Sequence, residues 1–151
     1  VVPCLPYLSS LVVNDHEIGA ITGIQTNSDR EANVDAIKFA AKSALNNSHM
    51  DFVLVHFPKG AVLVARNGQE VVQPSVNIPQ QSIKGTNGAG DAFSAGFFYG
   101  YHEGMPFLDA MKLGHAAAAA SLLSVETYTS VECAEKCLNL AENWGWRDLI
   151  L

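Results

Sequence analysis

The sequence predicts an α/β fold in which a largely parallel sheet is covered by helices. Short apolar runs rich in valine and leucine, typical of buried strands, alternate with longer segments whose apolar residues recur at helical spacing. A glycine-rich turn, residues 84–90, also leads directly into an apolar segment that predicts a helix. Ligands of such folds bind beyond the carboxyl ends of the strands, so we expect the functional loops at that edge.

Composition narrows the class of protein. The chain has 151 residues, 48% of them hydrophobic, which is enough for one compact domain. Its net charge of −6 makes nucleic acid an unfavourable partner, because backbone recognition needs clustered Lys and Arg. Any phosphate bound here must therefore be held by backbone amides and a metal more than by a general positive field.

The cysteines and the apolar runs indicate the cellular compartment of the protein and its relation to membranes. Cys4, Cys133 and Cys137 cannot all pair within the chain, and the first residues lack the basic and then apolar layout of a signal peptide. The longest apolar run, residues 116–123, is short for a membrane span. We expect a reduced, cytoplasmic setting and no membrane association.

The first half of the chain predicts two strands separated by two helices. A loop or short helical turn leads to a strand at 10–13, and Asn14 to Glu17 opens a short helix that ends at Thr22-Gly23. Ser28 and Asp29 are predicted N-caps of a helix reaching about residue 46. Its core face carries apolar residues at helical spacing: Val34, Ile37, Ala41, Ala44 and Leu45. Residues 51–55 predict the next buried strand.

The middle of the chain predicts antiparallel turns followed by helices. A turn at 57–60 leads to a strand at 61–65, and Asn67-Gly68 indicates a hairpin into a strand at 70–72. A helix over 90–103 should bury three aromatic residues and end at Gly104, and the next should start at Pro106. The three aromatic residues are Phe93, Phe97 and Phe98.

The end of the chain predicts one more helix. Residues 129–132 match a capping box for a helix to about 143, on which Cys133 and Cys137 lie four residues apart. Two thiols are too few ligands for a metal site, so buried packing is favoured for them. The apolar tail, Trp144, Trp146 and 149–151, is expected to pack on the domain or on a partner.

The glycine-rich turn carries the candidate chemistry. Gly88, Ala89 and Gly90 have almost no side chain, so their N–H groups, at the start of a helix, can approach and bind a phosphate. Asp91 follows at once, and a carboxylate beside a phosphate cradle suits the acceptance of a proton from an attacking hydroxyl. The alternative is that Asp91 merely caps a helix after a glycine turn.

The longer string Thr86-Asn87-Gly88-Ala89-Gly90-Asp91-Ala92-Phe93, followed by Ser94-Ala95-Gly96-Phe97, resembles the C-terminal signature of the ribokinase-like, or PfkB, family of carbohydrate and nucleoside kinases. The resemblance implies a three-layer sandwich with helices on both faces of a mostly parallel sheet. It also implies that Asp91 is the catalytic base and that Gly88, Ala89 and Gly90 form the anion hole, with Thr86 and Asn87 beside the nucleotide.

Asn14 and Glu17 are a second point of resemblance, because such kinases place an Asn-x-x-Glu motif beside the phosphates. The family implies that Asn14 contacts the nucleotide and that Glu17 acts on Mg²⁺ mostly through water. Alone, the pair is also explained as a helix cap. His115 falls where a small polar residue of the family often lies near the adenine, and it could equally be a core or surface histidine.

The sequence departs from the family pattern at two places. Where the family commonly has Thr-x-Gly-x-x-Gly, this chain has His56-Phe57-Pro58-Lys59-Gly60, and only Gly60 is retained for the nucleotide site. Gly85 stands where the family usually has an Asp that helps bind a monovalent cation, so potassium activation is left open.

The sequence as a whole predicts an ATP- and Mg²⁺-dependent kinase that phosphorylates a sugar or a sugar-like alcohol. The resemblance covers residues 1–151 but matches only the C-terminal, nucleotide-binding and catalytic part of a family member. We therefore expect a fragment lacking the acceptor and lid part, which on its own could be inactive. A nucleotide-binding or interaction module without catalysis, and a purely structural role for the loop, are the alternatives. A homo-oligomer is left open.

Overall fold

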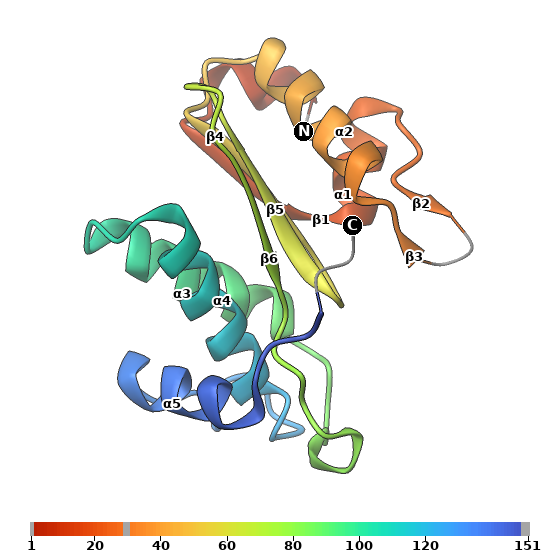
Figure 1. Cartoon of the computed structure of the whole chain (residues 1–151). Coiled ribbons are helices and arrows are strands. Elements are labelled where there is room, and N and C mark those ends of the chain that lie inside the picture. Colours follow the sequence, from red (N-terminus) through yellow and green to blue (C-terminus); the bar gives the residue numbers. More distant parts are fainter. Residues whose placement is uncertain (1, 29–30, 149–151) are drawn as a thin grey trace. The chain divides into compact units, whose positions relative to one another are not determined.

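The computed structural model describes residues 2–28 and 31–148, and the α/β class is as predicted (Figure 1). Contacts divide the chain into two compact units, the first reaching Val72 and the second beginning at Gln73. The first unit holds two helices and the strands up to Val72, and the second holds the last two residues of the final strand, Gln73 and Pro74, and three helices. Each unit is built around its own cluster of buried side chains.

The first unit begins with a 3₁₀ turn, Val2–Tyr7, that leads into β1, Ser10–Asn14. The helices α1, Asp15–Thr22, and α2, Val34–Asn46, then connect β1 to β4, Phe52–Phe57. Between the two helices lies a small antiparallel hairpin of β2, Asn27–Ser28, and β3, Glu31–Ala32. A turn and a hairpin follow, giving β5, Gly60–Ala65, and β6, Glu70–Pro74.

The sheet has the strand order β1-β4-β5-β6, with β1 parallel and β5 antiparallel to β4. Because side chains alternate along a strand, Val53 and Val55 of β4 point to one face. They join Val62 and Val64 of β5 in a core with α1 and α2. Ile37 of α2 is fully buried in this core, as its spacing predicts.

The second unit is a helical assembly. It consists of a short 3₁₀ turn, Gln80–Ser82, and the helices α3, Ala89–His102, α4, Phe107–Ser121, and α5, Ala134–Trp144. The helices α3 and α4 pack closely because small residues meet at their interface: a Cβ at Gly96 would lie 2.8 Å from the Leu113 carbonyl oxygen. Gly104, at φ 78°, ends α3 as predicted.

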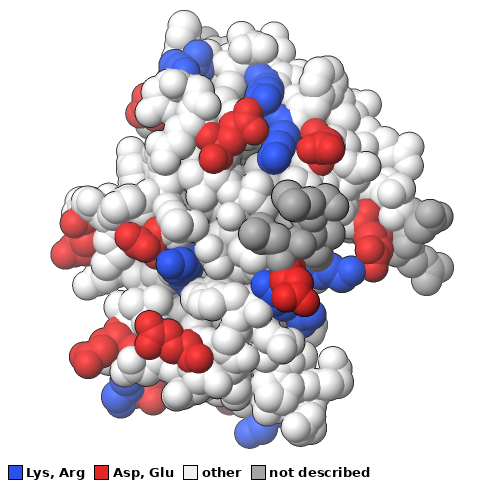
Figure 2. Space-filling view, viewed as in Figure 1, with Lys and Arg blue, Asp and Glu red and all other residues white. Residues whose placement is uncertain are grey.

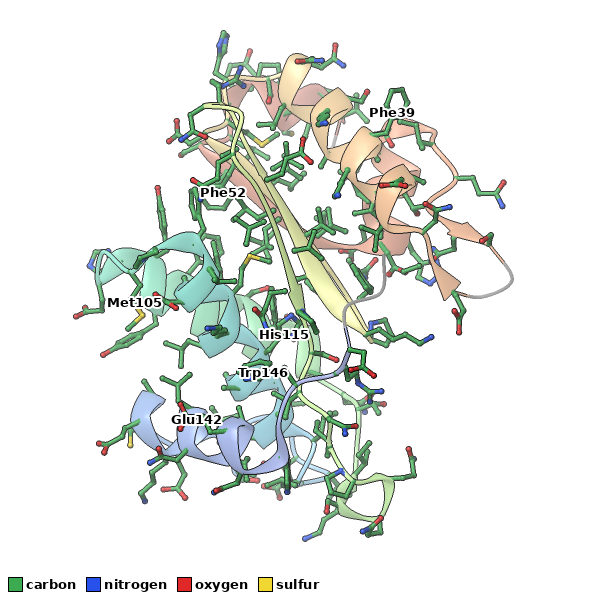
Figure 3. The ribbon with its side chains drawn as sticks, in the orientation of Figure 1. Phe39, Phe52, Met105, His115, Glu142 and Trp146 are labelled. Atoms are coloured by element: carbon green, nitrogen blue, oxygen red, sulfur yellow. The ribbon has the colours of Figure 1, made fainter. Side chains whose placement is uncertain are left out.

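The apolar tail packs partly as predicted. Trp144 and Trp146 contact the cluster formed by α4, α5 and Val76, and Trp146 also forms a β-bridge with Val76 (Figure 3). This contact joins the beginning of the second unit to its end, because Val76 follows β6 and Trp146 follows α5. The predicted packing of residues 149–151 lies outside the described residues.

Three local predictions are wrong. The N-cap of α2 is Asn33, whose side chain accepts the Ala36 N–H, whereas Ser28 lies in β2 and Asp29 falls outside the described residues. Phe98 is 41% exposed, because Phe93 and Phe97 occupy the buried side of α3. The capping box at 129–132 does not form: α5 begins after Cys133, and the Ser130 hydroxyl donates to the Ala120 carbonyl instead.

Candidate functional site

The start of α3 has an unusual N-cap. Gly88 occupies this position with φ 77° and ψ 0°, in the left-handed region that glycine alone adopts readily. It contributes no side-chain hydrogen bond to the helix, although its carbonyl accepts the Ala92 N–H at 2.8 Å. The first N–H groups of a helix have no partner within the helix and are suited to bind an anion. Of those in α3, the Ala89 N–H makes a long hydrogen bond, 3.5 Å, to the Thr86 carbonyl.

Asp91 lies in the first turn of α3 and is exposed. Within residues 2–28 and 31–148 it makes no ion pair. A carboxylate in this position interacts favourably with the helix dipole and stays accessible to a hydroxyl group. Thr86 and Asn87, immediately before Gly88, are exposed as well. The second unit thus brings together all the candidate residues between Thr86 and Asp91.

A second loop, residues 122–130, supports the glycine-rich turn. The Lys84 N–H donates to the Leu122 carbonyl at 2.8 Å. Gly88 packs on Thr127 so closely that a Cβ at this position would lie 2.8 Å from the Thr127 Cβ. The loop itself is held by the hydrogen bond from Ser130 to the Ala120 carbonyl. Sequence analysis missed Thr127, because neither a motif nor a hydrophobic period marks this loop.

The structure has no room for the Asp that the family usually has at the position of Gly85. A Cβ on Gly85 would lie 2.9 Å from the Ser124 carbonyl oxygen and 3.1 Å from the Val125 Cα, so the backbone of the second loop fills the space that a carboxylate would need. The position offers neither a ligand nor room for one. A monovalent cation held by a side chain at residue 85 is therefore not supported by the arrangement of this loop.

A pocket of about 680 Å³ opens beside the start of α3. The helices α3, α4 and α5 and the loop around Thr127 line it, with Gly88 and Asp91 at one end. Most of its other residues are apolar or small: Ala92, Ala95, Gly96, Tyr99, Leu113, Ala117, Tyr128, Val131, Ala134 and Cys137. The exposed Cys133 also lines the pocket. Cys137 is buried, and this burial raises the pKa of its thiol. Of the predicted cysteine packing, only that of Cys137 is confirmed.

In the first unit, Asn14 and Glu17 form a complete capping box at the start of α1. The Asn14 Oδ1 accepts the Glu17 N–H at 2.8 Å, and the Glu17 Oε2 accepts the Asn14 N–H at 2.8 Å. Glu17 is exposed, and its second carboxylate oxygen can still accept a hydrogen bond from a metal-bound water. The interpretation of this pair as a helix cap is therefore confirmed, whereas a role of Glu17 toward Mg²⁺ stays a prediction.

The strand register places Gly60 at the same edge of the sheet as Asn14. Asn14 pairs with His56 at the end of β1, and His56 pairs with Ala61, the residue after Gly60. Gly60 is buried where the Pro58-Lys59 turn enters β5. The first unit thus brings two of the candidate nucleotide-binding residues together, as expected for the carboxyl edge of a parallel strand pair.

His115 is a satisfied core histidine. It is 4% exposed on α4, its Nε2 lies 3.2 Å from the Gln73 carbonyl oxygen, and its ring meets Phe93 edge-on at 4.8 Å (Figure 3). This geometry matches the second of the two interpretations of the sequence. A contact between His115 and a nucleotide base stays a prediction.

Metal ligands and surface charge set limits on the bound groups. Among the described residues, no cluster of three or more His, Cys, Asp or Glu side chains could hold a metal. The face drawn in Figure 2 has basic and acidic side chains interspersed. None of the described helices is both long and apolar enough to cross a bilayer.

Comparisons with known proteins agree on one family. The description "pfkB family carbohydrate kinase" matches residues 3–134. Adenosine kinase of Schizosaccharomyces pombe is 29% identical over 114 residues, which are 74% of this chain and 33% of that protein. Ribokinase of Haemophilus influenzae is 24% identical over 139 residues, covering 92% of this chain and 42% of that protein.

Solved structures show the same fold. Arabidopsis thaliana ribokinase, in complex with ribose and ATP, superposes with a TM-score of 0.79 and 24% identity over 94% of this chain and 43% of that one. A Methanocaldococcus jannaschii nucleoside kinase of the ribokinase family superposes with a TM-score of 0.70 and 18% identity, over 92% and 41%. The chain thus spans between a third and about two fifths of the length of these relatives.

Proposed function

The chain belongs to the pfkB family of carbohydrate kinases, and from this premise we propose that it is the C-terminal, nucleotide-binding and catalytic part of an ATP-dependent kinase for a sugar or sugar-like alcohol. Residues 1–151 would supply the phosphate cradle and the catalytic base. The acceptor-binding and lid part would come from sequence outside this chain, which spans only 43% of the Arabidopsis ribokinase.

The start of α3 is the single observation that carries this proposal. The helix begins at a glycine with positive φ and no side-chain cap, and an exposed carboxylate follows within one turn. The Ala89 N–H makes only a long hydrogen bond, 3.5 Å, to the Thr86 carbonyl, which a phosphate oxygen could replace. Phosphoryl transfer asks a protein chiefly for alignment and for stabilisation of charge. The amides of Gly88, Ala89 and Gly90 would hold the charge of the transferred group, and Asp91 would take the proton from the acceptor hydroxyl.

The remaining candidates would hold the nucleotide and its metal. ATP supplies the phosphoryl group, and Mg²⁺ would neutralise its phosphates. Glu17 would contact the metal through water, with Asn14 and Gly60 at the same edge of the sheet. In the second unit, Thr86 and Asn87 would contact the nucleotide. His115 would support the base side of the site from the core, where it holds the Gln73 carbonyl.

The test is Asp91→Asn, in a protein that also contains the acceptor-binding part. We expect nucleotide affinity to stay within about twofold, because the substitution keeps the shape of the side chain. Turnover should fall by on the order of a hundredfold or more, the usual size of general-base catalysis. ADP release with a panel of sugars and nucleosides measures turnover, and calorimetry measures ATP binding. An unchanged turnover would remove Asp91 from the mechanism.

A second function, nucleotide binding without catalysis, is favoured for the isolated chain by its short coverage of the relatives. The chain alone would then bind ATP weakly and release no ADP with any acceptor. Adding the missing part in the same polypeptide would restore release if the kinase function is right. Absence of any ATP affinity in both forms would leave the glycine-rich turn with a structural role only.

A further inference from the structure

The pocket beside α3 has the size and shape of a small-molecule site. Its floor is α4, with Leu113 and Ala117, and its walls are α3 and α5, with Ala95 and Cys137. The loop around Thr127 closes one end. At about 680 Å³ it lies within the roughly 300 to 1,000 Å³ usual for pockets that enclose an organic ligand.

The charges of the pocket select the kind of ligand. Among its lining residues there is neither Lys nor Arg, and the two charged members are Asp91 and Glu132. Glu132 is occupied by an ion pair with Lys136 one helical turn along. Asp91 makes no ion pair within the described residues, so it is the free carboxylate at the mouth of an apolar space.

This combination excludes an anion and favours a cation. An anionic group in the pocket would have to lie close to Asp91 without a compensating positive side chain, which is electrostatically unfavourable. At the Gly88 end of the pocket, the backbone N–H groups of the α3 start can offset this repulsion for a phosphate, but the lining side chains between α3, α4 and α5 offer an anion no positive charge. An ammonium group, by contrast, can pair with Asp91 while an aromatic body fills the apolar part.

We propose that this pocket binds a small aromatic amine, with its ring system between α3, α4 and α5 and its ammonium group on Asp91. Binding itself is independent of the kinase function. One consequence rests on that function: if Asp91 is the catalytic base, a bound amine covers it and inhibits phosphoryl transfer.

The test uses three probes of the same shape and different charge: 2-(1-naphthyl)ethylamine, 2-(1-naphthyl)ethanol and 1-naphthylacetate. Their affinities for the chain are measured by fluorescence titration at low and at high salt. We expect the amine to bind at least tenfold more tightly than the carboxylate, with the alcohol between them, and the preference to shrink in salt. Equal affinities, or no binding of any probe, would overturn the proposal.

Two variants locate the binding. Ala95→Trp fills the pocket from an exposed position and should lower amine affinity at least tenfold, whereas Phe98→Trp, on the same helix but outside the pocket, should not. Asp91→Asn keeps the pocket open and should reduce the amine to the affinity of the alcohol. An Ala95→Trp or Asp91→Asn protein that binds the amine like the wild type contradicts the proposed site.

Two thiols provide a readout that needs no activity. Cys133 is exposed and lines the pocket, whereas Cys4 is exposed in the first unit. The amine should slow alkylation of Cys133 by N-ethylmaleimide several-fold and leave Cys4 unchanged, as peptide mass spectrometry can follow. Equal rates at Cys133 with and without amine would place the ligand elsewhere. Parallel ATP titrations separate this outcome from failure of the kinase proposal, because the pocket and the phosphate cradle bind different probes.

Discussion

Two helix starts in this molecule carry candidate functional residues, and they solve the same chemical problem in opposite ways. At the start of α1, Asn14 and Glu17 satisfy each other's backbone N–H groups in a capping box. At the start of α3, Gly88 provides no side-chain cap. The free N–H groups of a helix start must find a partner in the protein, in water or in a ligand.

The difference indicates which start is prepared for an anion. At α1, the side chains already use two of the backbone donors, and the Glu17 carboxylate would repel a phosphate that approached without a metal. At α3, no side chain caps the helix, and Gly88 has a φ of 77°, which other residues rarely adopt, and packs closely on Thr127. The contrast supports the proposal that α3 contacts phosphate directly and that α1 acts through a metal.

The largest expected effect is that of Gly88→Val. A β-branched residue at φ 77° is strained, and its Cβ would collide with Thr127 at 2.8 Å. We expect a loss of about 2 to 3 kcal/mol in the free energy of unfolding. ATP affinity should fall at least tenfold, because the helix start that forms the cradle is displaced. Urea denaturation and calorimetry measure the two quantities.

Gly104→Ala is the matched control for this substitution. Gly104 has φ 78°, like Gly88, but a Cβ there would meet nothing within 4 Å. The control should cost about 1 kcal/mol from backbone strain and leave ATP binding unchanged. If Gly88→Val leaves ATP binding unchanged, as Gly104→Ala is expected to do, the start of α3 does not form the phosphate site.

An intermediate effect on the free energy of unfolding is expected at the start of α1. Two substitutions there distinguish the contribution of the capping hydrogen bond from that of the Glu17 charge. Asn14→Ala removes the acceptor of the Glu17 N–H and should lower the free energy of unfolding by about 1 kcal/mol. Glu17→Gln keeps an oxygen for the Asn14 N–H and should cost only about 0.5 kcal/mol, the size of a lost charge–dipole interaction. Urea denaturation at neutral pH measures both costs.

The same pair tests the assignment of Glu17 to the metal. If Glu17 acts on Mg²⁺ through water, Glu17→Gln should weaken ATP binding several-fold with Mg²⁺ present and leave it unchanged in EDTA. If ATP binding by the Glu17→Gln protein depends on Mg²⁺ as in the wild type, Glu17 serves only as part of the cap of α1. Candidate ligand contacts would then be left at the start of α3 but not at Glu17.

The smallest expected effect is a pH dependence at the surface of the first unit. Lys42 lies 2.6 Å from Glu70, and its hydrogen bond lowers the pKa of that carboxyl below the usual value. A carboxyl with a lowered pKa in the folded state stabilises the protein above its unfolded pKa. The contribution of Glu70 to stability is therefore lost as the pH falls through its pKa in the folded state. The loss should be below about 1 kcal/mol, because the pair is exposed to solvent.

Denaturation of the wild type and Glu70→Gln between pH 6 and pH 3 checks this prediction. The two proteins should converge in stability at the acid end, since the wild-type carboxyl is then protonated. A constant difference across the whole range would mean that the ion pair contributes nothing that depends on the charge of Glu70.

Much of the fold could be predicted from local patterns. Valine-rich runs gave the strands β4 and β5, and the helical spacing of residues such as Ile37 gave the buried face of α2. The turns followed from single residues with a backbone preference, as with Gly104 after α3. These features depend on the nearest few residues, so a sequence pattern is sufficient to identify them.

Other features could not be predicted because several residues competed for one role. The segment before α2 offers both Ser28 and Asn33 as N-caps, and the β2–β3 hairpin takes Ser28, which leaves the cap to Asn33. Thr129 was the predicted cap of the last helix, yet its hydroxyl donates to the Ser124 Oγ at 2.9 Å instead. The outcome depends on which polar groups are nearby in space.

By itself, the sequence determined the candidate chemistry: a string of small residues followed by Asp91 at a helix start, because glycine and acid preferences at helix ends are local. Only the tertiary structure decided what surrounds that string. The loop at 122–130 fills the space next to Gly85, Thr127 supports Gly88, and three helices leave an apolar pocket beside Asp91. The contacts of Gly85 and Gly88 with this loop join residues more than thirty positions apart, and packing between distant segments leaves no periodic signal in the chain.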